Sequence, residues 1–138
     1  MTVSSTAHLL GKLSDSRQDD LLLEKEGAYQ PWPAYGNSKL ANVLFAKELA
    51  RRLQARASGV TSVVLHPGVC RTELGRYLFD PSRVPSFLYP VLGVVAAPAV
   101  YLTKSSVQGA QTQIYLAASP DISVRDSGKY YDNSKVAD

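Results

Sequence analysis

The chain is poor in the residues that build disulfides and metal centres. Its 138 residues include one cysteine, Cys70, and two histidines, His8 and His66, which lie far apart in the sequence. A single cysteine excludes an internal disulfide and is compatible with a reducing compartment. Two distant histidines with no other residues at ligand spacing do not indicate a metal site. We therefore expect no bound metal.

The chain also has no large excess of positive or negative charge. The 15 basic and 12 acidic residues leave a net charge of +3, and the charges are dispersed except for the pair Arg51 and Arg52. This balance is too weak for a nucleic-acid-binding surface, so we expect no nucleic-acid partner and a solvated face around the two arginines. With 45% hydrophobic and 20% charged residues, the composition is that of one globular domain over residues 1–138.

The segment Tyr35-Gly-Asn-Ser-Lys39 opens a helical pattern that continues to about Arg56. A spacing of four residues on a helix places the phenol and the ammonium on one face, one turn apart. Free tyrosine titrates near pH ~10, but a cation about 4 Å away in a partly shielded site is worth on the order of 4 kcal/mol, and the first helical turn adds the positive end of the helix dipole. Tyr35 and Lys39 are therefore candidates for a general acid/base pair.

The same spacing recurs at Tyr131 to Lys135, so spacing alone does not decide the assignment. Only the first copy is followed by apolar residues at helical period: Leu40, Val43, Leu44, Leu49 and Leu53. We predict that Tyr35 and Lys39 are functional and that Tyr131 is structural. Pro33 is expected just before the helix start, and Gly59 is expected to end the helix.

Two strand patterns flank this helix. Residues 1–5 resemble the end of a strand, residues 7–33 are loop-like, and Val60 to His66 resemble a buried strand ended by Pro67-Gly68. Strand, helix and strand form a βαβ unit, and in open parallel sheets ligands bind beyond the carboxyl ends of the strands. We therefore expect Ser5, the helix start and Pro67-Gly68 to meet at one crevice.

The second half carries two further signals. Residues 105–108 have the spacing of a capping box, which predicts a helix from there, and residues 127–131 are typical of a last strand. Residues 85–102 lack charge and approach the length of a membrane span, although Pro90, Gly93 and Pro98 argue against a spanning helix. The first residues do not form a signal peptide, so we expect a cytoplasmic or membrane-associated location.

Five motifs in order resemble the short-chain dehydrogenase/reductase family, and the retinol dehydrogenase-like branch in particular. They are V-S-S-T-A-H at 3–8, A-Y-G-N-S-K-L-A-N at 34–42, H-P-G-V-C-R-T-E-L at 66–74, G-A-Q-T at 109–112 and S-G-K-Y at 127–130. The resemblance implies hydride transfer between a nicotinamide cofactor and an alcohol or carbonyl compound. It favours NADP over NAD as that cofactor. It implies a lipophilic, retinoid-like substrate, with residues 85–102 as its apolar lid; peripheral membrane contact and core packing are the alternatives. It also implies a homodimer.

The resemblance also implies roles for single residues. Tyr35 would be the general acid/base, Lys39 would lower the tyrosine pKa and bind the nicotinamide ribose, and Ser5, in preference to Ser4, would hold the substrate oxygen. The loop of Pro67, Gly68, Val69 and Thr72 would pack against the nicotinamide. Such roles suit carbonyl chemistry, which needs hydrogen-bond donors positioned where negative charge develops on the substrate oxygen.

The family's glycine-rich pyrophosphate turn is absent, because neither G-x-x-x-G-x-G nor G-x-G-x-x-G occurs in the sequence. The chain thus resembles only the C-terminal half of the family's fold. We expect an α/β fold with an incomplete, Rossmann-like doubly wound parallel sheet of about three strands. Alone it is expected to be inactive. The alternative is a non-catalytic truncated fragment that pairs with a full-length relative.

Overall fold

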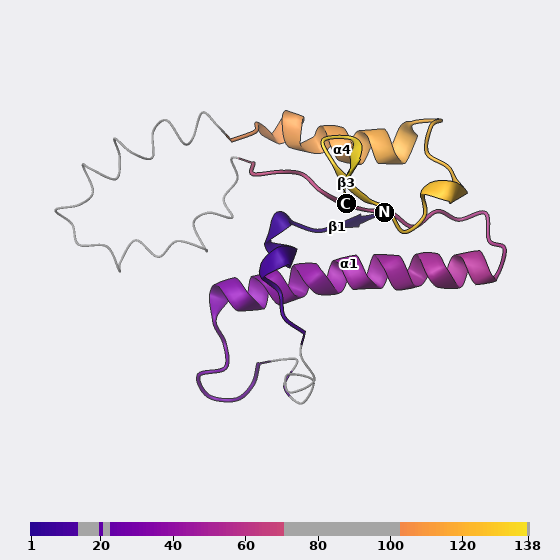
Figure 1. Cartoon of the computed structure of the whole chain (residues 1–138). Coiled ribbons are helices and arrows are strands. Elements are labelled where there is room, and N and C mark those ends of the chain that lie inside the picture. The colour runs from indigo at the N-terminus through magenta and orange to yellow at the C-terminus, as the bar shows by residue number, and fades with distance from the viewer. Residues whose placement is uncertain (14–19, 21–22, 71–102, 138) are drawn as a thin grey trace.

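A small sheet lies between two helices in the computed structural model, which describes residues 1–13, 20, 23–70 and 103–137 (Figure 1). The sheet order is β1 (Thr2–Val3), β2 (Val64–His66), β3 (Tyr130–Asp132) and β4 (Lys135–Ala137). The first three strands are parallel, and β4 is antiparallel to β3. The chain therefore has the predicted incomplete Rossmann-like α/β architecture. The number of strands differs, because the expected last strand is followed by β4.

The two faces of the sheet carry separate apolar clusters. Val64 packs with Val43 and Ala46 of α1 (Pro31–Ala55), whereas the residues before and after it in the chain point to the opposite face. There Val63, Leu65 and Tyr131 pack with Leu116 of α4 (Ser106–Ala118). Because both faces of β2 are covered, its buried run shows no polar alternation, as in doubly wound sheets. The burial of Tyr131 confirms its structural assignment.

The long helix α1 begins earlier than predicted and ends close to the predicted Arg56, but Gly59 is not the residue that ends it. It begins at Pro31, which takes the first helical position because proline has no amide hydrogen to satisfy. It ends at Ala55, and Ala57, not Gly59, adopts the left-handed conformation, with φ +48°. The amides of Ala57 and Ser58 donate to the carbonyls of Gln54 and Leu53, the bond pattern of a Schellman motif.

Other local predictions have mixed outcomes. Ser105 and Gln108 form the predicted capping box at the start of α4. Within the predicted loop of residues 7–33, the short 3-10 helix η1 (Thr6–Leu10) was missed, as was η5 (Val124–Asp126) later in the chain. The second tyrosine–lysine motif is a β3–β4 hairpin, and its turn residues Asn133 and Ser134 both have positive φ.

Some predictions fall outside the described residues. Thr72 and the uncharged run 85–102 are among them, so the expected role of that run as a lid stays a prediction. Within the described ranges, no helix has the length and apolar character to cross a membrane.

Candidate functional site

Tyr35 and Lys39 lie together on α1. The Lys39 ammonium nitrogen is 5.5 Å from the centroid of the Tyr35 ring, and both side chains are partly exposed. The earlier helix start changes one part of the expectation. Tyr35 is the fifth residue of α1 and lies in its second turn, beyond the first turn where the helix dipole acts most strongly. The helix dipole therefore acts less strongly on the Tyr35 phenol than a position in the first turn would allow.

The two serines after β1 have different partners. Ser4 is only 2% exposed, and its hydroxyl donates to the Lys39 carbonyl oxygen at 2.8 Å. Ser5 is partly exposed, and its hydroxyl oxygen accepts the Ala7 amide at 3.2 Å, capping η1. A hydroxyl that accepts one bond still has its own proton to donate. The arrangement favours Ser5 over Ser4 as the substrate-facing hydroxyl, while Ser4 fastens β1 to the helix turn of Lys39.

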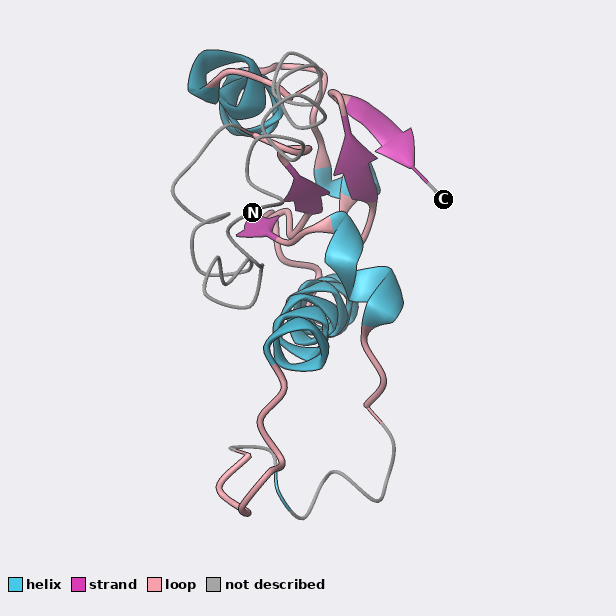
Figure 2. Cartoon of the chain, turned by 90° about the vertical axis from the view of Figure 1, so that its left-hand side faces the viewer, coloured by secondary structure: helices cyan, strands magenta, loops and turns pink. Residues whose placement is uncertain are grey.

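Close backbone packing holds η1 against the start of α1, and the two segments lie side by side in Figure 2. Gly11 and Gly36 meet here: a Cβ on Gly11 would lie 2.8 Å from the Gly36 carbonyl oxygen. Two amide side chains of α1 add polar contacts, because Asn37 accepts the Lys12 amide at 2.8 Å and Asn42 donates to the Val3 carbonyl at 3.1 Å. The Ser5 segment is thereby fixed to the helix that carries Tyr35.

The loop after β2 lies at the same edge of the sheet. The Ser4 amide donates to the Leu65 carbonyl at 2.7 Å, so β1 and β2 end side by side. Beyond β2, Gly68 adopts φ +83°, and the Val69 side chain is 70% exposed. The structure thus brings Ser5, the Tyr35 helix turn and Pro67–Val69 to the carboxyl ends of neighbouring parallel strands.

A cluster of polar groups that the sequence did not reveal lines a cavity of about 420 Å³ between α1, η1 and the sheet. His66 stacks on Tyr130 with ring centroids 5.8 Å apart, and His8 lies 5.0 Å from the same ring. Burial, followed by the charge of Asp132, raises the pKa of Tyr130 to about 12. Side chains alternate between the two faces of a strand, so Tyr130 and Asp132 lie on the same face of β3. A strand of three residues is too short for this alternation to be recognised in the sequence.

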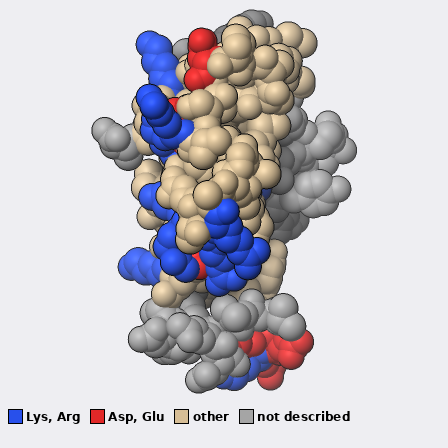
Figure 3. Space-filling model, turned by 90° about the vertical axis from the view of Figure 1, so that its right-hand side faces the viewer, with Lys and Arg blue, Asp and Glu red and all other residues tan. Residues whose placement is uncertain are grey.

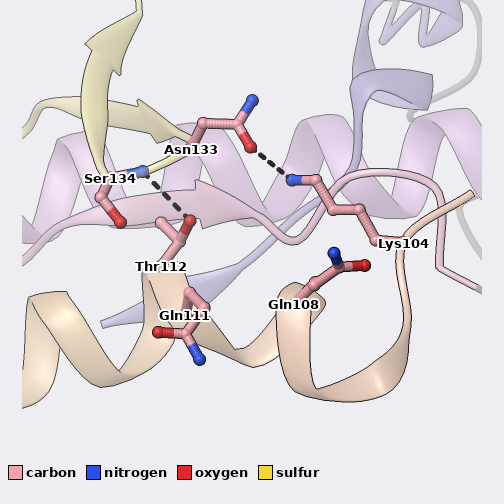
Figure 4. Close-up of a pocket in the computed structure, with 6 residues that line it drawn as sticks. All are labelled: Lys104, Gln108, Gln111, Thr112, Asn133 and Ser134. Atoms are coloured by element: carbon pink, nitrogen blue, oxygen red, sulfur yellow. Dashed lines mark hydrogen bonds between the residues drawn. The ribbon is translucent and has the colours of Figure 1, made fainter.

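A smaller cavity of about 300 Å³ lies between α4 and the β3–β4 turn (Figure 4). The ammonium of Lys104 donates to the Asn133 side-chain oxygen at 2.5 Å and to the Pro67 carbonyl at 3.2 Å. Thr112 accepts the Ser134 amide at 3.1 Å. Lys104 thus connects the hairpin turn to the loop after β2, and Thr112 connects the turn to α4.

Basic side chains gather near the end of α1 (Figure 3). Arg51 and Arg52 are exposed and both bind Glu48 at 2.7 Å, which confirms the solvated face expected there. The hydrogen bond from Arg51 and then that from Arg52 lower the pKa of Glu48 to about 2. The shared carboxylate offsets part of the local positive charge. Within the described ranges, no group of three potential metal-ligating side chains occurs.

Comparison with known proteins identifies the family. No protein-family model matches the chain. Retinol dehydrogenase 14 from Homo sapiens is 42% identical over 126 residues, covering 91% of this chain and 34% of that protein. Dehydrogenase/reductase SDR family member 13 from Bos taurus is 40% identical over 137 residues, covering 99% of this chain and 32% of that protein. The chain belongs to the short-chain dehydrogenase/reductase family.

A solved structure and a further relative also match most of this chain. A crystal structure of an uncharacterized protein from Mycobacterium paratuberculosis superposes with a TM-score of 0.57 at 30% sequence identity, covering 93% of this chain and 34% of that one. Retinol dehydrogenase 13 from Homo sapiens is 41% identical over 137 residues, and these cover 37% of it. The chain thus lies on the retinol dehydrogenase-like branch and spans about a third of the length of the curated relatives it matches.

Proposed function

We propose that this chain provides the acid/base and nicotinamide-facing part of an NAD(P)-dependent oxidoreductase that interconverts an alcohol and a carbonyl compound. The observation that carries the proposal is the position of the Lys39 ammonium over the Tyr35 ring, on the helix to which the Ser5 segment is fastened. The relatives named retinol dehydrogenases support a lipophilic, retinoid-like alcohol or aldehyde as the substrate class.

Each of the three side chains has a chemical task in this proposal. During carbonyl reduction the Tyr35 phenol donates a proton to the developing alkoxide, and during alcohol oxidation the phenolate takes it back. The Lys39 ammonium, which lies over the Tyr35 ring, is the cationic partner of the phenol in this proposal. Ser5 donates a hydrogen bond to the substrate oxygen, where negative charge grows in the transition state.

The described residues fit the nicotinamide end of the cofactor. Val69 is exposed at the carboxyl end of β2, and Lys39 presents an ammonium group for a ribose hydroxyl. A bound NAD(P), with NADP preferred, would supply or accept the hydride. The sequence contains no glycine-rich turn for the pyrophosphate, so that part of the binding site has to come from outside these 138 residues.

The test uses this chain alone and the same chain joined to the glycine-rich half of retinol dehydrogenase 14, with NADPH and retinaldehyde. We expect turnover in the joined protein and none in the chain alone. Tyr35→Phe should lower kcat by about 100-fold or more, the usual contribution of a general acid. Tyr29→Phe is the matched control, because Tyr29 is an exposed tyrosine before α1. Activity in Tyr35→Phe equal to that of the control would refute the mechanism.

The second candidate function is a non-catalytic chain that pairs with a full-length relative or with itself. It is favoured by the exposed face of α1, where Leu44 and Phe45 are 48% and 59% exposed. Sedimentation of the purified chain, with and without retinol dehydrogenase 14, tests this role. Association that disappears in Phe45→Ser supports it, and a chain that stays monomeric in both samples contradicts it. Peripheral membrane contact would appear as binding to lipid vesicles when these are added in a separate sedimentation run.

A further inference from the structure

His66 lies between the sheet and the loop proposed to face the nicotinamide. It is the last residue of β2 and is 7% exposed. Its Nδ1 atom accepts the backbone amide of Gly68 at 3.0 Å. A nitrogen that accepts a hydrogen bond cannot carry a proton, so the proton of the neutral ring belongs on Nε2. The bond to Gly68 therefore requires one tautomer of this histidine.

The carboxylate of Asp132, which is partly exposed but has one buried oxygen, favours the same tautomer. The Asp132 Oδ1 atom lies 3.2 Å from His66 Nε2, although no hydrogen bond reaches this buried oxygen within the described residues. An acceptor in this position is best satisfied by a proton on Nε2. On the other side of the loop, Lys104 donates to the carbonyls of Pro67 and Val69 through its ammonium and its amide. The loop is thus fixed at its amide by His66 and at its carbonyls by Lys104.

We infer that His66 is a positioning residue: its Nδ1 atom fixes the Pro67–Val69 loop, with Asp132 holding the ring in the Nε2-protonated tautomer. The part of this inference that concerns cofactor contact rests on the proposed function. His66 itself does not touch the reacting atoms. It sets the backbone of Gly68, whose φ of +83° determines the direction in which the exposed Val69 leaves the sheet.

The other histidine provides an internal contrast. His8 Nδ1 lies 2.7 Å from the Ser5 carbonyl oxygen, and a carbonyl can only accept, so the proton of His8 belongs on Nδ1. The two histidines of the chain should therefore be opposite tautomers. The ring 15N spectrum of the full 138-residue chain near pH 8 tests this directly. We expect unprotonated Nδ1 in His66 and protonated Nδ1 in His8, and protonated Nδ1 in His66 would overturn the inference.

Two substitutions separate positioning from packing. In His66→Asn the amide oxygen can take the place of Nδ1, so the Gly68 amide should keep its protection from hydrogen exchange within about threefold. In His66→Gln no acceptor remains at that place, and exchange should be about tenfold faster. His8→Gln is the matched control and should leave the Gly68 amide unchanged. Equal protection in His66→Gln and the wild type would refute the inference. If either variant fails to fold, the wild-type tautomers decide.

Cofactor contact is tested separately with NADPH and the joined protein. We expect His66→Gln to weaken NADPH binding about tenfold and His66→Asn to stay within about threefold of the wild type. If the wild-type joined protein does not bind NADPH, the proposed function fails while the tautomer result stands. If it binds NADPH and both variants bind equally well, the positioning role fails while the proposed function stands.

Discussion

The contact between η1 and α1 gives a sharp test of how the site is held together. Gly11 has φ −70°, a conformation that alanine adopts easily, so Gly11→Ala changes packing without backbone strain. The added Cβ would lie 2.8 Å from the Gly36 carbonyl oxygen and 2.8 Å from the Leu40 Cβ. Both neighbours belong to α1, and one is backbone, so the two segments have to separate. Overpacking of this kind costs about 1–3 kcal/mol.

The assay is urea unfolding followed by circular dichroism, together with the melting temperature. For a chain of this size, a loss of about 1–3 kcal/mol lowers Tm by roughly 4–12 °C. Gly59→Ala is the matched control, because a Cβ at Gly59 meets no atom within 4 Å. There the substitution should be neutral or stabilise by up to about 1 kcal/mol, through a less flexible unfolded chain. If Gly11→Ala and Gly59→Ala have the same unfolding midpoint, the close packing of η1 on α1 is wrong.

Two further predictions concern the end of α1 and the buried tyrosine. Ala57→Gly should stabilise by about 0.5–1 kcal/mol, because Ala57 has φ +48° and glycine adopts this conformation without the Cβ penalty; an unchanged urea midpoint would contradict it. The pKa of Tyr130 is raised to about 12, so stability that is complete below pH ~10 should be lost as the pH rises from about 10 through about 12. Tyr130→Phe should reduce this alkaline loss, as measured by Tm against pH; identical alkaline profiles would argue against the raised pKa.

Local rules predicted those features that short segments determine by themselves. The capping box at Ser105 is one, since the bonds of a helix start lie within four residues. The helix after Lys39 is another, because its apolar residues repeat over several turns. The structural assignment of Tyr131 also followed from local sequence, because its motif is followed by no helical pattern. The structure places this motif in a β-hairpin, with Tyr131 buried. The acid/base role of Tyr35 stays a prediction.

Contacts between segments that are distant in the sequence could be identified only from the tertiary structure. His66 and Asp132 are 66 residues apart, and they meet only because β2 and β3 pair in parallel register. The close approach of Gly11 and Gly36 depends on how η1 packs on α1, which no local pattern contains. The sequence by itself determined the family motifs, the elements with strong periodicity and the absence of a glycine-rich turn. The register of the sheet and the packing of η1 decided which polar groups share the site, because contacts between distant residues depend on three-dimensional packing and leave no periodic signal in the chain.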